Sequence, residues 1–292
     1  MASRSTAPAA SNGASAARPR DPPATTFEAD PVLDDITPVG DSTTTPISPP
    51  PPTKPYFGLT LVTNWPPPTK ELVQPYNTFL QSIRECFDPS DLEGDAPSVY
   101  LYDGAYLHVT VATLHPVLPR RQLLSEPQGT PDNDPEYYEN LEETWKNFVS
   151  SARSRSDWPT VPLRFEIDSC QIGTKAGILL WKETTGGLAQ IRSCLKEEAA
   201  KTNVSSPRGG GGEIRIHSIP PIVHSTFLRF RKAPLNTNGE NVQSKMSAVV
   251  MPKLKDTFHY TIIARDVKLA CERIPYMHIT NHPEYILASY PF

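Results

Sequence analysis

From residue 56 onward, apolar side chains recur along the chain at the spacings typical of strands and helices. Strands are predicted over residues 56–63, 98–102, 107–114, 161–172, 176–182, 222–231, 258–272 and 276–279. Helices are predicted over residues 71–87, 135–152, 187–201 and 241–254. The order of these elements indicates an α+β chain.

The predicted elements form a weak internal repeat. Each half runs strand, helix, strand, and the last strand of each half carries a histidine. The first half uses residues 57–63, 71–87 and 107–114, and the second uses 161–182, 187–201 and 222–230. A duplicated strand–helix–strand unit predicts a two-lobed fold with a central cleft.

Residues 1–54 differ in composition from the rest of the chain. They are rich in Ala, Ser, Thr and Pro and nearly devoid of large apolar side chains before Phe27. Such a segment buries too little apolar surface to offset its ordering entropy. We therefore expect a disordered tail over residues 1–54 and one folded domain over 55–292. The first 20 residues lack acids, as transit peptides do, but they also lack the Leu and Phe of an amphipathic helix, so a plain tail is favoured.

Charge and cysteine content narrow the class of protein. The net charge of −4 argues against a general nucleic-acid coat protein, but it allows one small phosphorylated ligand in a local pocket. No apolar run approaches the ~20 residues that span a bilayer, and no signal-peptide core is present. The four cysteines are widely spaced without a CxxC pair, which is typical of reduced and mostly buried thiols in an intracellular protein. We expect a cytoplasmic or nuclear monomer without a membrane partner.

Two short segments share one pattern, His-x-Thr-hydrophobic, at matching places in the repeat. They are HVTV, which starts at His108, and HSTF, which starts at His224. On a strand, residues two apart point to the same face. His108 and Thr110 therefore share one face, as do His224 and Thr226, while the residues between them point to the core.

The residue types of these tetrads suit phosphodiester chemistry. Breaking a phosphodiester requires a base that activates a nucleophile and an acid that protonates the leaving oxygen. Histidine can hold either role near neutral pH. A threonine hydroxyl can donate to a non-bridging phosphate oxygen. The scheme requires no metal or other cofactor, and the remaining histidines show no regular metal-ligand spacing.

A third match, HYTI, starts at His259. We favour His224 as the partner of His108 because each of these two strands follows a predicted helix of its repeat, and His259 has no such counterpart. Surface or capping roles are expected for the histidines beside prolines, turns and strand ends: His115, His217, His278 and His282. Arg229 and Arg231 are expected on the face opposite His224. Core packing is favoured over base stacking for Tyr102, Tyr106 and Trp181.

The paired tetrads, each on a strand that closes an α+β half, resemble the two-histidine (2H) phosphoesterase superfamily. The resemblance covers roughly residues 56–279 in the order of elements, and only the tetrads are specific. It implies two lobes related by a pseudo-twofold axis around a phosphate-sized cleft. It also implies a functional quartet of His108, Thr110, His224 and Thr226. The long spacing between the tetrads fits an insertion over residues 116–134, which concerns the loops on the substrate side.

The leading hypothesis is a metal-independent phosphodiesterase that acts on a cyclic phosphate nucleotide or an RNA end. The alternatives are a nucleotide- or RNA-binding module of the same fold without turnover, and an interaction protein that works through its Pro-rich tail. The nucleophile stays open among water, an RNA hydroxyl and the 2′-hydroxyl of the substrate. Which histidine is base and which is acid also stays open.

Overall fold

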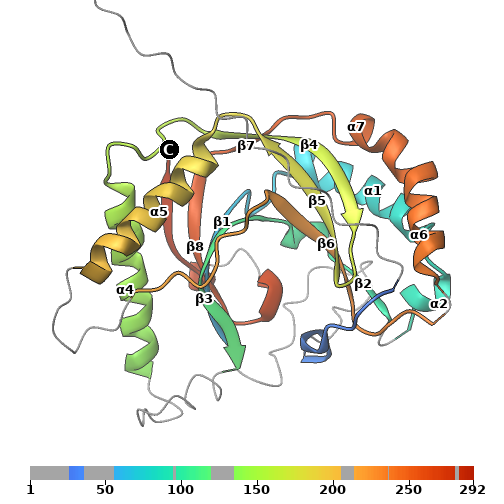
Figure 1. The fold of residues 1–292 in the computed structure, drawn as a ribbon, viewed down its shortest axis with the longest axis horizontal. Helices are drawn as coiled ribbons and strands as arrows, with labels where there is room; N and C mark the ends of the chain where they lie inside the picture. Colours follow the sequence, from blue (N-terminus) through green and yellow to red (C-terminus); the bar gives the residue numbers. More distant parts are fainter. Residues whose placement is uncertain are drawn as a thin grey trace, which may run out of the picture.

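The computed structural model of the chain describes residues 26–35, 56–94, 97–119, 135–204, 214–235, 237–279 and 283–292. Two antiparallel sheets, of four and five strands, form its two lobes (Figure 1). Helices cover one side of each sheet. The predicted α+β fold with two lobes is therefore confirmed.

The four-stranded sheet has the order β3-β1-β8-β9. Its strands are β1 (Tyr56–Thr63), β3 (Val109–Pro119), β8 (Asp266–Glu272) and β9 (Ile286–Pro291). Two long helices, α4 (Pro135–Arg153) and α5 (Gly187–Val204), lie beside this sheet and contact each other (Figure 1). Because β3 is at the edge of the sheet, one side of it is open to the second lobe.

The five-stranded sheet has the order β2-β6-β5-β4-β7. Its strands are β2 (Val99–Leu101), β4 (Leu163–Ile172), β5 (Ala176–Glu183), β6 (His224–Phe230) and β7 (Ile262–Ala264). The helical segments on its outer side are Thr69–Val73, α1 (Gln74–Arg84), α2 (Pro89–Leu92), α6 (Gly239–Lys245), Met246–Val250, Met251–Lys253 and α7 (Leu254–Thr257). Strand β2 pairs only with residues 228–230 of β6, so the first half of β6 is open on that side.

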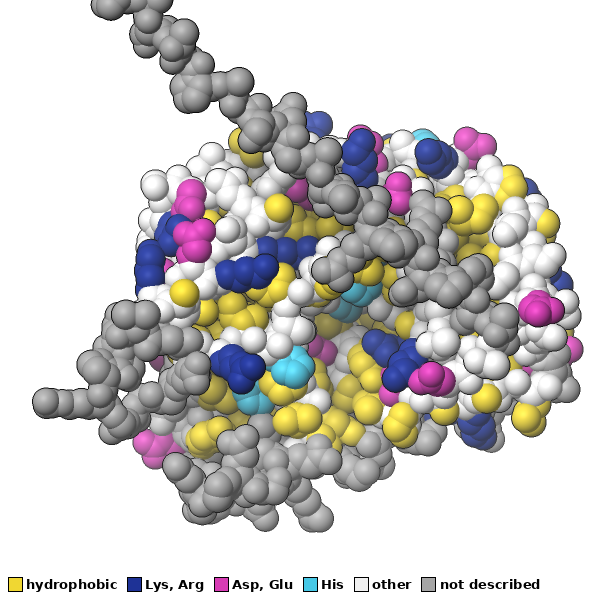
Figure 2. Space-filling model, viewed as in Figure 1, with side chains coloured by type: hydrophobic (Ala, Val, Ile, Leu, Met, Phe, Trp, Pro, Cys, Tyr) yellow, Lys and Arg dark blue, Asp and Glu magenta, His cyan; other side chains and the backbone are white. Residues whose placement is uncertain are grey.

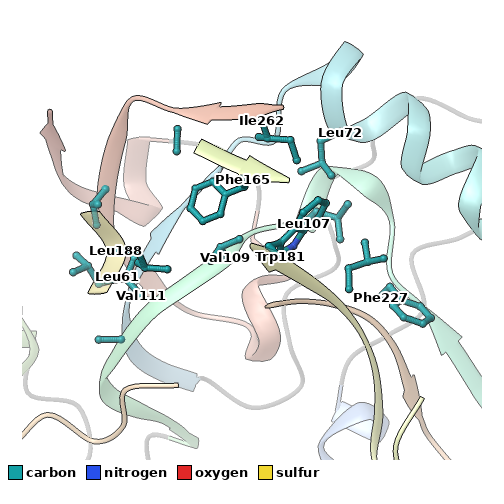
Figure 3. Packing of buried hydrophobic residues seen from close by; sticks show 14 of the residues in the cluster. Leu61, Leu72, Leu107, Val109, Val111, Phe165, Trp181, Leu188, Phe227 and Ile262 are labelled. Atoms are coloured by element: carbon teal, nitrogen blue, oxygen red, sulfur yellow. The ribbon is translucent and has the colours of Figure 1, made fainter. Parts of the chain in front are cut away.

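The two halves of the sequence repeat exchange their helices. Helix α1 belongs to the first half, but its Phe79 ring lies 5.0 Å from that of Phe227 in the second sheet. Helix α5 belongs to the second half, but it contacts β3 of the first sheet, and Leu188 lies near Val111 (Figure 3). Each lobe therefore buries its apolar face with a helix from the other half.

The predicted division of faces at the first tetrad is confirmed by burial. Leu107, Val109 and Val111 are at most 1% exposed. Figure 3 shows them within the apolar core, where Leu107 and Val109 lie close to Trp181. His108 and Thr110, between them in sequence, are partly exposed. The strand therefore packs on the core with one face and offers its polar residues on the other.

The strand predicted over 276–279 is wrong. Pro275–Met277 forms a 3-10 turn, in which Tyr276 and Met277 have φ angles of 60° and 57°. Left-handed angles are unfavourable for residues with a Cβ atom. The buried Glu272 carboxylate holds this turn, because it accepts hydrogen bonds from Thr60 Oγ1 and from Met277 N, the latter at 2.9 Å. Strand β9 was also missed.

Residues 26–35 of the predicted N-terminal tail are ordered, so the expectation of disorder is wrong for these ten residues. Residues 26–35 pack on the domain, where Phe27 stacks on Phe230 with ring centroids 4.2 Å apart. Leu33 is fully buried in a small apolar cluster with Val62 and Trp65. Phe27 and Leu33 supply the apolar surface that the residues before them lack. The rest of the predicted tail lies outside the described residues.

The described residues bear on the expectations for membrane-spanning segments and for the cysteine thiols. No helix in this part of the chain is long and apolar enough to cross a membrane. All four cysteines are buried and free of disulfide bonds. The expectation of buried thiols is confirmed.

Docking of residues 26–35 predicts a measurable stability effect. Leu33→Ala should lower the free energy of unfolding by about 2–5 kcal/mol, because it removes a fully buried side chain and leaves a cavity. The matched control is Leu235→Ala, since Leu235 is 90% exposed and should contribute little. Urea denaturation of both variants checks this. Equal stability of Leu33→Ala and the wild type would show that the segment does not dock.

Candidate active site

The two tetrad histidines lie at the starts of their strands. His108 immediately precedes β3, and its Nδ1 donates to Tyr106 O at 2.9 Å. His224 is the first residue of β6. In His108 the bond to Tyr106 O fixes the proton on Nδ1 and leaves Nε2 with a lone pair in the neutral ring.

A buried serine joins the two histidine strands. Ser225 Oγ donates to His108 O at 2.7 Å and accepts from Trp181 Nε1 at 3.0 Å. Ser225 is 2% exposed and lies between His224 and Thr226 in sequence. The structure therefore brings the two tetrads side by side, with the backbone of one tied to the side chain next to the other histidine.

Arg192 of α5 makes a second link across the same junction. Its Nε donates to Val111 O at 3.1 Å, and its Nη2 donates to Thr110 O at 3.0 Å and to Ile222 O at 3.3 Å. Burial lowers the pKa of this guanidinium to about 10. Sequence reasoning did not single out Arg192, because its helix position gives no hint of its three carbonyl partners.

The two threonines lie where the tetrad pattern predicts. Thr110 and Thr226 are both partly exposed, on the same strand faces as His108 and His224. Neither hydroxyl donates a hydrogen bond to any residue that the structure describes. Both are therefore available to an oxygen atom of a ligand.

Arg229 was predicted on the face opposite His224, and this is wrong. In the pairing of β5 with β6, Ile178 lies opposite Thr226 but Gly177 lies opposite Leu228, so Phe227 is extra. Such a β-bulge reverses the alternation of faces beyond it. The positive charge of Arg229 consequently acts on both tetrad histidines, and it contributes to lowering their pKa values.

His278 was expected to have a surface or capping role, and it is instead 1% exposed. Its Nδ1 donates to Pro275 O at 2.9 Å, and its Nε2 lies 2.7 Å from the Tyr100 hydroxyl. The first bond places the ring proton on Nδ1, so the Tyr100 hydroxyl is the donor in the second. The ring also packs against Tyr106, with centroids 5.0 Å apart. Its sequence neighbours do not reveal this burial, which depends on the Pro275–Met277 turn.

Other expectations for aromatic and histidine residues are settled by exposure. Tyr102 and Trp181 are 2% and 6% exposed, which confirms core packing, and Tyr106 is buried as well. His259, the third match, is exposed in the turn after α7, where its Nδ1 bonds to Asp256 O at 2.9 Å. It has no described contact with the two tetrads.

Burial and positive charge keep the site histidines neutral. Desolvation is the main cause that lowers the pKa of His108 to about 4, and the charges of His224 and Arg229 add to it. Desolvation, followed by the charge of Arg192, lowers the pKa of His224. Desolvation lowers the pKa of His278 to about 4. An anion between these rings would reverse the effect, because a negative charge favours the protonated ring.

Figure 2 shows a face of the molecule on which histidine side chains lie among hydrophobic side chains, with Lys and Arg side chains nearby. Within the described ranges, no three His, Cys, Asp or Glu side chains are arranged to hold a metal ion. The arrangement is suited to an anionic ligand.

The chain matches no protein-family model and no curated protein. Among solved structures it is similar to a conserved protein of unknown function from Agrobacterium tumefaciens, with 14% identity over 80% of this chain and 87% of that one and a TM-score of 0.44. It is similar to E. coli LigT complexed with 3'-AMP, with 13% identity over 82% and 96% and a TM-score of 0.38. It is also similar to TT0787 of Thermus thermophilus, with 11% identity over 80% and 97% and a TM-score of 0.39. Each of these similarities concerns the fold alone.

Lowering the pH is expected to destabilise the protein. His108 and His278 have pKa values of about 4 in the folded state, below the ~6.5 of an unfolded chain. Between these values the unfolded state binds more protons, so the free energy of unfolding falls as the pH drops from ~6.5 toward ~4. His278→Asn should reduce this dependence, and the exposed His259→Asn should not. Urea denaturation of each variant at about pH 7.5 and about pH 5 measures this pH dependence of the free energy of unfolding. The same pH dependence in His278→Asn and the wild type would contradict the burial of a neutral ring.

Proposed function

We propose that this chain is a metal-independent phosphodiesterase in which His108 and His224 act as an acid–base pair on one phosphodiester. The observation that carries the proposal is the junction that brings the two tetrads together. Ser225 Oγ donates to His108 O, and Arg192 donates to the backbone of both segments, at Thr110 O and Ile222 O. Two equivalent imidazoles at one junction are suited to opposite sides of a single phosphate.

The reaction needs one ring in each protonation state. Nε2 of a neutral histidine accepts the proton of the attacking hydroxyl or water, and the other histidine, as an imidazolium, gives its proton to the leaving oxygen. In the free protein burial favours the neutral form of both. The negative charge of the bound phosphate raises their pKa values, so the histidine that acts as the acid takes up a proton from solvent when the substrate binds. Either ring can start as the base.

The remaining groups of the site stabilise the phosphate. The hydroxyls of Thr110 and Thr226 donate to the non-bridging oxygens, on which charge accumulates in the transition state. Arg229 supplies a positive charge that acts on both rings. Arg192 contributes its positive charge and holds the junction. Its Nε and Nη2 donate to backbone carbonyl oxygens rather than to the phosphate.

The substrate class that fits is a cyclic phosphate nucleotide or an RNA end. Both rings are partly exposed at one junction, which suits a phosphodiester that is accessible from one side. The alternative is a nucleotide- or RNA-binding module without turnover, and the low pKa of His108 is the observation in its favour, since an acid must be protonated to act. Incubation with 2′,3′-cyclic nucleotides and short RNAs, followed by product analysis, separates the two functions.

Replacing either histidine should abolish most of the activity. His108→Ala and His224→Ala are each expected to lower kcat by about 10²–10⁴-fold. The double variant should lose much less than the product of the two, because a concerted pair fails when either half is missing. Thr110→Ala and Thr226→Ala should each cost less, since each removes one neutral donor. Steady-state kinetics on folded variants checks this, with His259→Ala as the control. Turnover near the wild-type level in either single variant would favour the binding module.

Activity should persist in the presence of a chelator. The scheme assigns both proton transfers to imidazoles, so EDTA should leave kcat/KM within about twofold of its value without EDTA. The kcat/KM profile should be bell-shaped in pH, because one ring must be neutral and the other protonated. Loss of activity in EDTA that is restored by a divalent ion would contradict the mechanism.

A further inference from the structure

The docked N-terminal segment, residues 26–35, reaches the candidate active site. It runs beside the end of β6 and the β4–β5 turn, where Asp30 N donates to Phe230 O at 2.7 Å and Glu28 N donates to Thr174 O at 2.8 Å (Figure 1). Leu33 anchors its other end in the apolar cluster described above. These contacts place the Asp30 side chain against Arg229.

Asp30 and Arg229 form a largely buried ion pair. Arg229 Nη1 lies 2.8 Å from Asp30 Oδ2, and the two side chains are 22% and 12% exposed, respectively. The same carboxylate oxygen accepts from the Tyr276 hydroxyl at 2.7 Å, and Oδ1 accepts from Val32 N at 3.2 Å. Both oxygens of the Asp30 carboxylate therefore accept hydrogen bonds from the protein.

Three groups together fix the Arg229 guanidinium. Its Nε donates to the Tyr102 hydroxyl at 3.1 Å, its Nη1 is paired with Asp30, and its plane lies over the Tyr276 ring at 3.8 Å. No described residue accepts from its Nη2. A guanidinium held along one edge presents its remaining N–H groups in a fixed direction, which suits recognition of a phosphate.

We propose that Asp30 is a positioning residue of the phosphodiester site, which orients Arg229 toward the phosphate that His108 and His224 flank. The inference rests on the proposed function. It makes the docked N-terminal segment a part of the active site, although the sequence places it in a Pro-rich tail. Asp30 does not touch the substrate, and it acts only through Arg229.

Removal of the Asp30 charge can weaken or strengthen phosphate binding, and the direction separates a positioning role from competition for Arg229. By charge alone, removing an acid beside an anion site should strengthen phosphate binding. If Asp30 instead holds Arg229 in its binding geometry, its removal weakens phosphate binding despite the gain in positive charge. Weaker binding therefore reports the loss of positioning, and tighter binding would identify Asp30 as a competitor for Arg229.

The test is calorimetric titration of the full-length chain with inorganic phosphate, together with kinetics on a 2′,3′-cyclic nucleotide. Asp30→Asn is expected to weaken phosphate binding by about 10- to 100-fold, the range of a hydrogen bond to a charged group. KM should rise by more than kcat falls, because Arg229 binds the phosphate in the ground state. Glu28→Gln is the control, since the Glu28–Lys175 ion pair in the same segment is exposed.

Two further variants make the result specific to Arg229. In an Arg229→Lys background, Asp30→Asn should cause no additional loss, because both changes remove one shared interaction. Tyr276→Phe keeps the ring under Arg229 but frees the carboxylate, so it should weaken phosphate binding by about 2- to 10-fold. This second variant decides the question if Asp30→Asn does not fold.

Each outcome has one meaning. Unchanged or tighter phosphate binding in Asp30→Asn overturns the positioning role, whereas turnover by the wild type would leave the proposed function in place. Weaker binding without any turnover by the wild type supports positioning and overturns the hydrolytic function. A wild-type protein that neither binds phosphate nor turns over the cyclic nucleotide overturns both.

Discussion

The structure depends on one junction, where the open edge of β3 meets the open first half of β6. The unpaired backbone N–H and C=O groups at the edge of a strand need hydrogen-bond partners. Here Arg192 and Ser225 satisfy carbonyls of His108, Thr110 and Val111 without continuing the ladder. Because side chains rather than a ladder close the gap, the polar residues on both strands stay partly exposed.

The same junction sets the chemistry of the histidines. Packing of two sheets and their exchanged helices buries the rings, and burial disfavours the protonated form. The positive charges of Arg192, which holds the junction, and of Arg229 act in the same direction. The site is thus preorganised for an anion, since burial and the nearby cations disfavour protonation of the rings until a negative charge binds.

Local patterning predicted the tetrads, and long-range packing decided the rest. The alternation of Leu107, Val109 and Val111 with His108 and Thr110 is a property of the strand itself. Arg229 was misplaced because a bulge at Phe227 reverses the alternation, and a bulge of this kind has no clear sequence signal. His278 was misjudged because the turn that buries it is held by Glu272, six residues earlier, and by Thr60 in another strand. Burial of Leu33 likewise depends on residues far along the chain.

The central claim is that His108 and His224 face one bound phosphate. Its most direct test is an NMR titration of the wild-type protein with inorganic phosphate, in which the ring resonances of both histidines are followed. We expect both rings to shift together with one Kd and the pKa of each to rise on saturation, because one anion lies between them. A response from only one ring, or two different Kd values, would contradict a shared phosphate site.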